Sequence, residues 1–136
     1  MRIAVCLDDR LGMLFNRRRQ SRDRVVIADL IGSLGDARLR IAPFSERLFE
    51  GVERELLVSE DFLESAEGDD VCFVEDRSLG AVADRIDVLT VYRWNRHYPA
   101  DFYFDLDLQA SGFRLCERVE LAGYSHETIT KETYTK

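Results

Sequence analysis

The sequence lacks the features that mark several specialised classes of protein. Its 136 residues include only 2 prolines and 8 glycines, and no segment is of low complexity, so a fibrous or disordered chain is excluded. The longest uncharged apolar runs have about seven residues, whereas a membrane-spanning helix needs roughly 20. No basic and then apolar leader opens the chain, so we expect a cytoplasmic protein that does not contact a membrane. The length is typical of one domain, residues 1–136.

Cysteine and histidine are scarce, and their spacing forms no metal-binding motif. Cys6, Cys72 and Cys116 lie far apart, each within an apolar stretch, as is typical of reduced, buried thiols. The only histidines are His97 and His126, and no CxxC or HxxxH spacing occurs. The sequence therefore predicts neither a disulfide framework nor a structural zinc site.

Charge is unevenly distributed along the chain. The 26 acidic residues outnumber the 19 basic ones, and the net charge of −7 argues against a general nucleic-acid binder. Residues 10–24, however, contain six arginines and a single acid, Asp23. Contact with a nucleic acid is therefore not expected, but it stays open because of this cluster.

Strand-like and helix-like segments alternate in the first half of the chain, and strands follow one another in the second half. This order predicts an α/β fold, a three-layer sandwich with a mostly parallel central sheet and a C-terminal antiparallel hairpin. We expect strands at 2–7, 38–42, 55–58, 71–75, 87–94, 102–108, 113–121 and 128–135, and helices at 21–32, 45–52, 62–66 and 78–83.

Three details of this prediction can be compared with the structure. Residues 10–20 are polar and contain a glycine, which indicates a loop. Ser21 is a suitable cap for the helix that follows, with Asp23 in its first turn. The segment 128–135 is polar, as expected of an exposed final strand.

Two adjacent carboxylates, Asp8 and Asp9, follow the first strand, at the end where ligands bind in open α/β sheets. Adjacent residues of an extended chain point to opposite faces, so at most one of them faces a crevice. Together with Asp101 or Asp105, they have the chemistry of a divalent metal site. The other interpretation is a solvated turn that ends the strand.

The segment Asn16–Arg24 combines arginine side chains with amides at a predicted helix start, where backbone N–H groups favour anions. A phosphate, a nucleotide or an acidic partner would suit it. The alternative is an exposed basic stretch paired with the protein's own acids. The candidate ligand-binding residues here are Asn16, Arg17, Arg18, Gln20 and Arg22.

A second segment, Tyr92–Asp101, alternates aromatic and arginine side chains, which can stack on a flat ring and hold its phosphate. The same residue types are favoured in protein interfaces, and Tyr92 and Trp94 could instead pack within the core. His97 is a candidate general acid or base. The candidate ligand-binding residues are Arg93, Trp94, Asn95, Arg96, Tyr98 and Asp101.

The order of elements resembles a shortened dihydrofolate reductase. The first strand, the Leu11-Gly12-Met13 loop and Asp23 near a helix start stand in the order of that family, and so do residues 99–104 and the closing hairpin at 113–135. The resemblance implies the fold and, in the family, NADPH chemistry. Because the family's Gly-Gly pair at the cofactor pyrophosphate is absent from this sequence, we take the fold from the resemblance and leave the cofactor unassigned.

Two longer motifs resemble a group of short uncharacterised bacterial proteins. These motifs are DDxxGMxFNxRRQSxDR, matched from Asp8 to Arg24, and YRWNRxYPAD, matched from Tyr92 to Asp101. Some members of the group are labelled as tRNA-processing ribonucleases. Such metallo-nucleases need a cluster of histidine ligands that a chain with two histidines does not supply.

Together the two segments predict a cleft for a small anionic, ring-containing ligand such as a nucleotide. Arg17, Arg18 and Arg22 would contact phosphate, and Trp94 or Tyr98 would stack on the ring. Asn16 or Asn95 would fix the orientation of the ligand.

Two alternatives belong to other functional classes. One is a reductase-like or metal-dependent enzyme that uses Asp8, Asp9 or Asp23. The other is a homodimeric interaction module whose interface is formed by the aromatic turn and the polar final strand.

Overall fold

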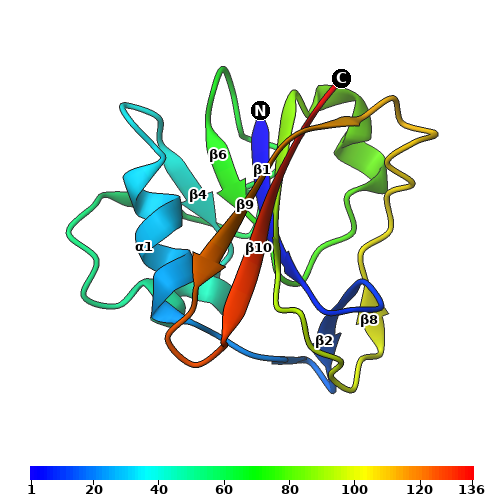
Figure 1. Cartoon of the computed structure of the whole chain (residues 1–136). Coiled ribbons are helices and arrows are strands. Elements are labelled where there is room, and N and C mark those ends of the chain that lie inside the picture. Colours follow the sequence, from blue (N-terminus) through cyan, green and yellow to red (C-terminus); the bar gives the residue numbers. More distant parts are fainter.

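A seven-stranded sheet forms the centre of the computed structural model, which describes residues 1–136 (Figure 1). Its strand order is β5-β4-β6-β1-β7-β10-β9. The first five strands in this order pair in parallel, and β10 pairs antiparallel with both β7 and β9. This arrangement confirms the predicted α/β sandwich. The strands are β1 (Arg2–Leu7), β4 (Leu39–Ile41), β5 (Leu56–Val58), β6 (Val71–Phe73), β7 (Val88–Arg93), β9 (Arg114–Ala122) and β10 (Thr128–Thr135).

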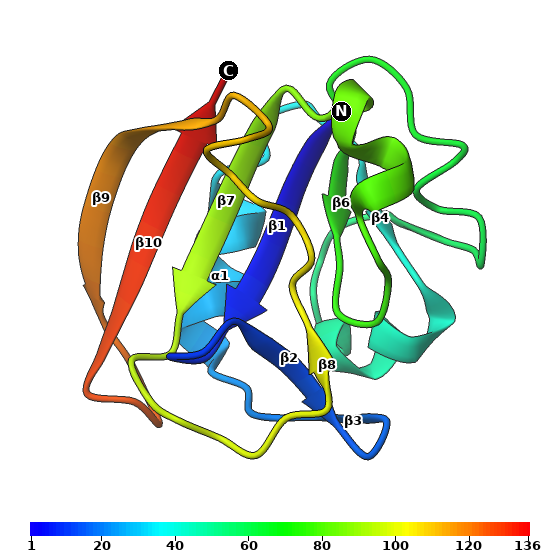
Figure 2. The ribbon, with the colours of Figure 1, turned by 90° about the vertical axis from the view of Figure 1, so that its right-hand side faces the viewer.

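Shorter elements cover both faces of the sheet (Figure 2). Helix α1 (Arg24–Gly32) and the 3-10 helix η1 (Pro43–Phe49) pack on one face. The 3-10 helix η2 (Gly80–Arg85) and a small second sheet lie on the other. That sheet has the order β3 (Arg18–Arg19), β2 (Gly12–Phe15), β8 (Phe102–Tyr103). None of the helices has the length and apolar character needed to cross a bilayer.

Alternation along the central strands divides the apolar residues between two cores. On β7, Leu89 and Val91 belong to the core beneath η2 and the small sheet, whereas Tyr92, and Trp94 just after the strand, lie in the core beneath α1. Successive residues of a strand point to opposite faces, so a strand buried on both sides is apolar throughout. This is why β1 and β7 are recognisable in the sequence as continuous apolar runs.

The last strand is not an edge strand, contrary to the prediction. β10 lies between β7 and β9, and Ile129 and Glu132 on it are buried. Its polar character is accommodated because the Glu132 carboxylate accepts hydrogen bonds from Arg93 and Arg118 on the two neighbouring strands. The exposed edge is β9, which is rich in charged residues that oppose pairing with another chain.

The predicted loop at 10–20 is a β-hairpin instead. β2 and β3 pair through a two-residue turn, Asn16–Arg17, in which both residues have positive φ, +51° and +61°. Such turns match the twist of the strands they join, and they favour asparagine and glycine. Because arginine is not favoured in the second turn position, residue preferences did not predict a turn at Arg17.

Three further boundaries differ from the predictions. Asp23, not Ser21, is the N-cap of α1, because its carboxylate accepts the N–H of Val25. The strand expected at 102–108 is reduced to β8, although Phe104 and Leu106 still point inward. The helix expected at 62–66 is only a turn.

Candidate functional site

The basic segment (residues 8–24) and the turn after β7 (residues 93–101) lie against each other, as the sequence predicts. The backbone N–H of Asp9 donates to the Arg96 carbonyl at 2.9 Å. The Asp101 N–H donates to the Leu14 carbonyl at 3.0 Å, and the Asp101 carboxylate accepts the N–H of Asn16 at 3.1 Å. These bonds join β2 to the residues before β8, beyond the carboxyl ends of β1 and β7 (Figure 2).

Asp8 organises this junction from the inside. Its buried carboxylate accepts the N–H groups of Gly12 at 2.7 Å and Tyr98 at 3.2 Å, and the side-chain amide of Gln20 at 3.1 Å. Burial opposes ionisation, but these hydrogen bonds and that from the Arg10 N–H lower the pKa of Asp8. Because this carboxylate accepts hydrogen bonds from both segments, it holds them together.

A narrow inner pocket opens beside this junction, at the carboxyl ends of the central strands. Its volume of about 20 Å³ holds about one water molecule. Its position agrees with the predicted crevice in an open α/β sheet. The lining side chains come from the strand ends, the basic segment, α1 and η1: Cys6, Met13, Arg19, Gln20, Ser21, Arg22, Asp23, Val26, Ile27, Leu48, Phe73, Val74, Glu75 and Trp94.

An ion pair closes the inner end of the pocket. The Arg19 guanidinium donates to both oxygens of the buried Glu75 carboxylate, which also accepts the hydroxyl of Ser45 at 2.7 Å. Burial and the nearby Glu75 carboxylate raise the pKa of the Cys6 thiol well above its ordinary value. Since the thiolate is the reactive form, Cys6 is not a nucleophile at neutral pH.

The inner pocket continues into a wider groove along α1, since both include Arg22, Asp23, Ile27 and Leu48 in their lining. The groove has a volume of about 880 Å³, within the range of small-molecule sites. Its apolar surface comes chiefly from α1 and from the segment around η1, and its charged lining residues are Arg22, Asp23, Arg24, Glu50 and Glu53. At one rim, the guanidinium of Arg24 lies 3.4 Å from the ring centre of the exposed Tyr124.

A buried polar cluster lies where pocket and groove meet. His126 Nδ1 is 3.0 Å from Asp23 Oδ2, and His126 Nε2 is 3.1 Å from Ser21 Oγ and 2.9 Å from the Tyr98 hydroxyl. Side chains of Asp23 and His126 are inaccessible to solvent, whereas Ser21 and Tyr98 are half-buried. The cluster joins the start of α1, the turn after β7 and the turn between β9 and β10.

Backbone donors keep Asp23 ionised within this cluster. Its carboxylate accepts the N–H groups of Val25, Tyr124, Ser125 and His126. Although burial acts in the opposite direction, these bonds and the one with the His126 ring hold the pKa of Asp23 far below its ordinary value. The imidazole therefore faces a fixed negative charge.

Several predicted ligand residues have contacts within the protein. Trp94 stacks on His126 with a centroid distance of 4.6 Å, so one face of the indole is covered. The Asn95 amide donates to the Thr128 carbonyl and the Thr130 hydroxyl on β10. Arg93 points to the opposite face of the sheet from Trp94, towards Glu132.

The other predicted residues surround the mouth of the site. Asn16, Arg17, Arg18, Arg22 and Arg96 are exposed, and so are Asp9 and His97. Asn16, Arg18, Gln20 and Tyr98 line a shallow depression between the two segments. No group of three or more His, Cys, Asp or Glu side chains has the proximity needed to hold a metal ion.

The sequence alone singled out neither Ser21 nor Tyr124 as a chemical group, and it gave His126 no catalytic partner. Ser21 lies within the first motif, but there its role was expected to be that of a helix cap. His126 and Tyr124 belong to a turn about 100 residues further on, and no local pattern connects that turn to α1. Only the contacts of the folded chain reveal this part of the site.

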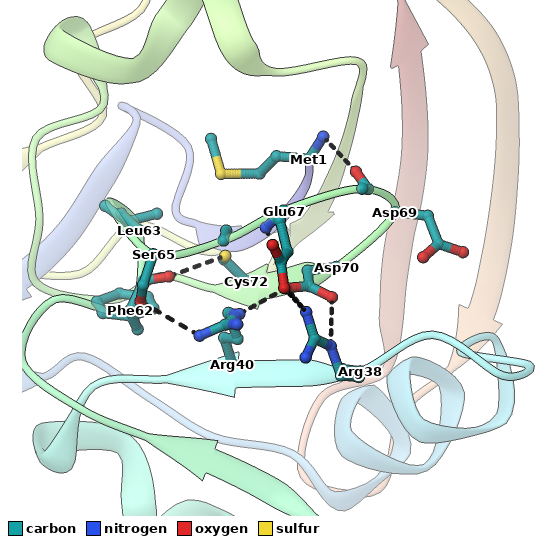
Figure 3. A network of polar contacts seen from close by, with 12 residues as sticks. Met1, Arg38, Arg40, Phe62, Leu63, Ser65, Glu67, Asp69, Asp70 and Cys72 are labelled. Carbon is teal, nitrogen blue, oxygen red and sulfur yellow. Dashed lines mark hydrogen bonds and ion pairs between the residues drawn. The ribbon is translucent and has the colours of Figure 1, made fainter.

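A second polar network lies at the opposite end of the sheet (Figure 3). The buried Asp70 carboxylate pairs with Arg38 at 2.9 Å and Arg40 at 2.6 Å, and Glu67 adds a contact to Arg38. It joins the amino ends of β4 and β6, and none of its residues lines the inner pocket or the groove along α1. We assign this network to stability.

The fold class of the chain is that of dihydrofolate reductase. A solved structure, "Dihydrofolate reductase from Enterococcus faecalis complexed with NADP(H)and RAB-propyl", superposes on it with a TM-score of 0.67. The match covers 99% of this chain and 95% of the reductase at 12% sequence identity, which establishes similarity of fold alone. No protein-family model and no curated protein sequence matches the chain. The resemblance to the short bacterial proteins stays a prediction.

Proposed function

We propose that the protein binds a small anionic, ring-containing ligand, of which a nucleotide is the model, in the groove along α1 and its inner pocket. The observation that carries the proposal is that most arginines of the basic segment have no carboxylate partner. Of its six arginines, only Arg19 has a carboxylate within 4.0 Å; the others are unpaired. Unpaired guanidinium groups beside a concave apolar surface favour an anionic ligand.

Arg22 is the residue that we expect to contact the charged group. It lines both the groove and the inner pocket, is exposed and forms no ion pair. The ring of the ligand would lie against Ile27 and Leu48, next to the pair formed by Arg24 and Tyr124. Arg17 and Arg18, at the mouth, would add long-range attraction.

Gln20 supplies a polar group for orientation. Its Oε1 atom is buried without a hydrogen-bond partner, while its amide nitrogen donates to Asp8 and to the Pro99 carbonyl. Burying a hydrogen-bond acceptor without a partner costs free energy, so an N–H group of a ligand that donates to Gln20 Oε1 would bind favourably. The similar reductase structure contains NADP(H), and this supports the idea that the fold can hold a nucleotide.

A thermal-shift screen tests the proposal. The probes are adenosine 5′-monophosphate, a pterin and glucose 6-phosphate, each at up to millimolar concentration. A ligand present at 100 times its dissociation constant stabilises the protein by about 2.7 kcal/mol, which is readily detected. The matched variants are Arg22→Gln and Arg114→Gln, because Arg114 is also exposed and unpaired but lies on the far strand β9.

We expect at least one anionic ring compound to raise Tm, and Arg22→Gln to reduce this shift while Arg114→Gln preserves it. Glucose 6-phosphate, which lacks a flat ring, should give a smaller shift. Equal shifts in both variants, or none with any probe, would contradict the proposal.

A further inference from the structure

The buried cluster at the junction of pocket and groove has the geometry of a serine nucleophile with its base. Ser21 Oγ lies 3.1 Å from His126 Nε2, and His126 Nδ1 lies 3.0 Å from Asp23 Oδ2. Both distances are within the range required for proton transfer from a hydroxyl to an imidazole that a carboxylate orients. Such an arrangement is recognised from geometry and not from the order of residues in the chain.

We propose that Ser21 is a nucleophile, with His126 as its general base and Asp23 as the residue that positions the imidazole, in the hydrolysis of a carboxylic ester. Ser21 lines the inner pocket and is half-buried, and this pocket continues into the groove at Arg22 and Asp23, so the proposal requires the ester group to extend from the groove into the pocket. The solvent-inaccessible Asp23 is fixed by four backbone donors and cannot rotate away from the ring.

The reaction needs water as its only co-reactant. Ser21 Oγ forms a bond to the ester carbonyl carbon, and its proton passes to His126 Nε2. The carbon–oxygen bond to the alcohol then breaks, and His126 returns the proton to the leaving oxygen. Water, deprotonated by His126, attacks the acyl-serine, releases the acid and restores the Ser21 hydroxyl.

A donor for the developing oxyanion lies next to the nucleophile. The backbone N–H of Arg22, the residue after Ser21, donates no hydrogen bond within the chain. An N–H in this position is a common oxyanion donor in serine hydrolases. The adjoining groove is lined by apolar side chains and by Arg22 and Arg24, with Glu50 and Glu53 also in its lining. We expect an ester whose acyl group has an apolar part for the groove and a negative charge for Arg22. This substrate class, unlike the nucleophile, rests on the proposed function.

A variant of Tyr98 distinguishes a catalytic role of the cluster from a structural one. Its hydroxyl is 2.9 Å from His126 Nε2 and 3.3 Å from Ser21 Oγ. When Nδ1–H is donated to Asp23, Nε2 has one lone pair, for which the two hydroxyls compete. Tyr98→Phe removes the competitor, so we expect the neutral probe to label Ser21 faster in this variant than in the natural sequence, and slower labelling would contradict the proposal.

The test is covalent labelling of the intact protein by a neutral alkyl fluorophosphonate. Ser21 Oγ would bond to phosphorus as fluoride leaves, and intact mass and peptide mapping would find one adduct, on Ser21. The control is Ser111→Ala, since Ser111 is also half-buried but forms no side-chain hydrogen bond; this variant should label normally. Ser21→Ala should not label, and His126→Ala should label about 10² to 10⁴ times more slowly.

Circular dichroism of each variant shows whether it is folded. If His126→Ala unfolds, the position of the adduct in the natural sequence still tests whether Ser21 is the nucleophile. Absence of an adduct on Ser21, or a rate no greater than that of other serines, would overturn the proposal. The neutral probe makes this result independent of anion binding: labelling without ligand binding refutes only the proposed function, and ligand binding without labelling refutes only the nucleophile.

Discussion

Asp23 Oδ2 and His126 Nδ1 are 3.0 Å apart although 103 residues separate them in the chain. This contact joins the N-terminus of α1 to the turn between β9 and β10, and no solvent reaches either side chain. The same carboxylate caps the helix through Val25. One residue therefore fixes the helix start, the late turn and the orientation of the imidazole next to Ser21.

The network around Asp70 should control acid stability. Although burial opposes it, hydrogen bonds from Arg38 and Arg40 lower the pKa of Asp70 from 3.8 to about 2. The folded-state pKa is thus below the unfolded one, so the stabilisation is complete above about pH 4 and is lost as the pH falls towards 2. We expect this contribution to be about 1–2 kcal/mol, less than the full shift because Arg38 is half-exposed.

Asp70→Asn tests this expectation. The variant should lose about 3 kcal/mol of unfolding free energy at pH 7, since it leaves Arg40 largely buried without its charge partner. The control is Glu67→Gln, whose exposed carboxylate pairs with Arg38 and should matter by less than about 1 kcal/mol. Urea unfolding between pH 2 and 7 measures both; similar losses in the two variants would refute the assignment.

Gly12 is required for the close approach of the two segments. A Cβ at this position would lie 2.6 Å from Gln20 Nε2, 2.7 Å from Ala100 Cβ and 2.8 Å from Asp8 Oδ2. We expect Gly12→Ala to destabilise the fold by about 1–3 kcal/mol, as overpacking does. Gly32→Ala is the matched control, because nothing lies within 4 Å of its Cβ and alanine favours the helix. If Gly12→Ala left the unfolding free energy unchanged, the two segments would not be tightly packed.

Arg17 occupies a left-handed turn position with φ of +61°. Glycine adopts this conformation without the penalty that a side chain incurs. Arg17→Gly should therefore raise the unfolding free energy by about 1 kcal/mol. Arg18→Gly, in the extended strand β3, should lower it by roughly 0.5–1 kcal/mol instead. Thermal unfolding of both variants provides the comparison, and equal signs would exclude this turn geometry.

The three cysteines should differ in reactivity. Burial raises the pKa of Cys72 to about 12, and the pKa of Cys6 is raised as well, whereas Cys116 is exposed on β9. Iodoacetamide at pH 8 should alkylate Cys116 first, and the other two only after denaturation. Peptide mapping after short exposure identifies the site. Early modification of Cys6 would mean that the inner pocket is open and its thiol activated.

The fold was more predictable than the details of its surface. The segments 2–7 and 87–94 are apolar because β1 and β7 are buried on both faces, and this property is local to each strand. The interior position of β10 was missed because its buried Glu132 is paired with Arg93 on β7 and Arg118 on β9. Local patterns do not contain such long-range pairs.

The site was predictable only in part, because local patterns show which segments are unusual but not which distant residues they contact. The dense motifs at 8–24 and 92–101 pointed to two segments that the fold brings together. His126 was not predicted to act with Ser21, because their contact depends on the path of the last hairpin. The ligand-binding roles of Arg17, Arg18, Arg22 and Tyr98 stay predictions.

Trp94 offers a direct measurement of the proposed binding site, because it is the only tryptophan and lines the inner pocket. The protein is titrated with adenosine 5′-monophosphate while Trp94 fluorescence is recorded, for the natural sequence, Arg22→Gln and Arg114→Gln. Loss of a hydrogen bond to a charged group costs about 1.5–3 kcal/mol, or roughly a 10- to 100-fold weaker affinity. We expect a saturable change that Arg22→Gln weakens to this extent and Arg114→Gln does not alter. No change up to millimolar nucleotide, or equal affinity in all three proteins, would contradict a nucleotide site at Arg22.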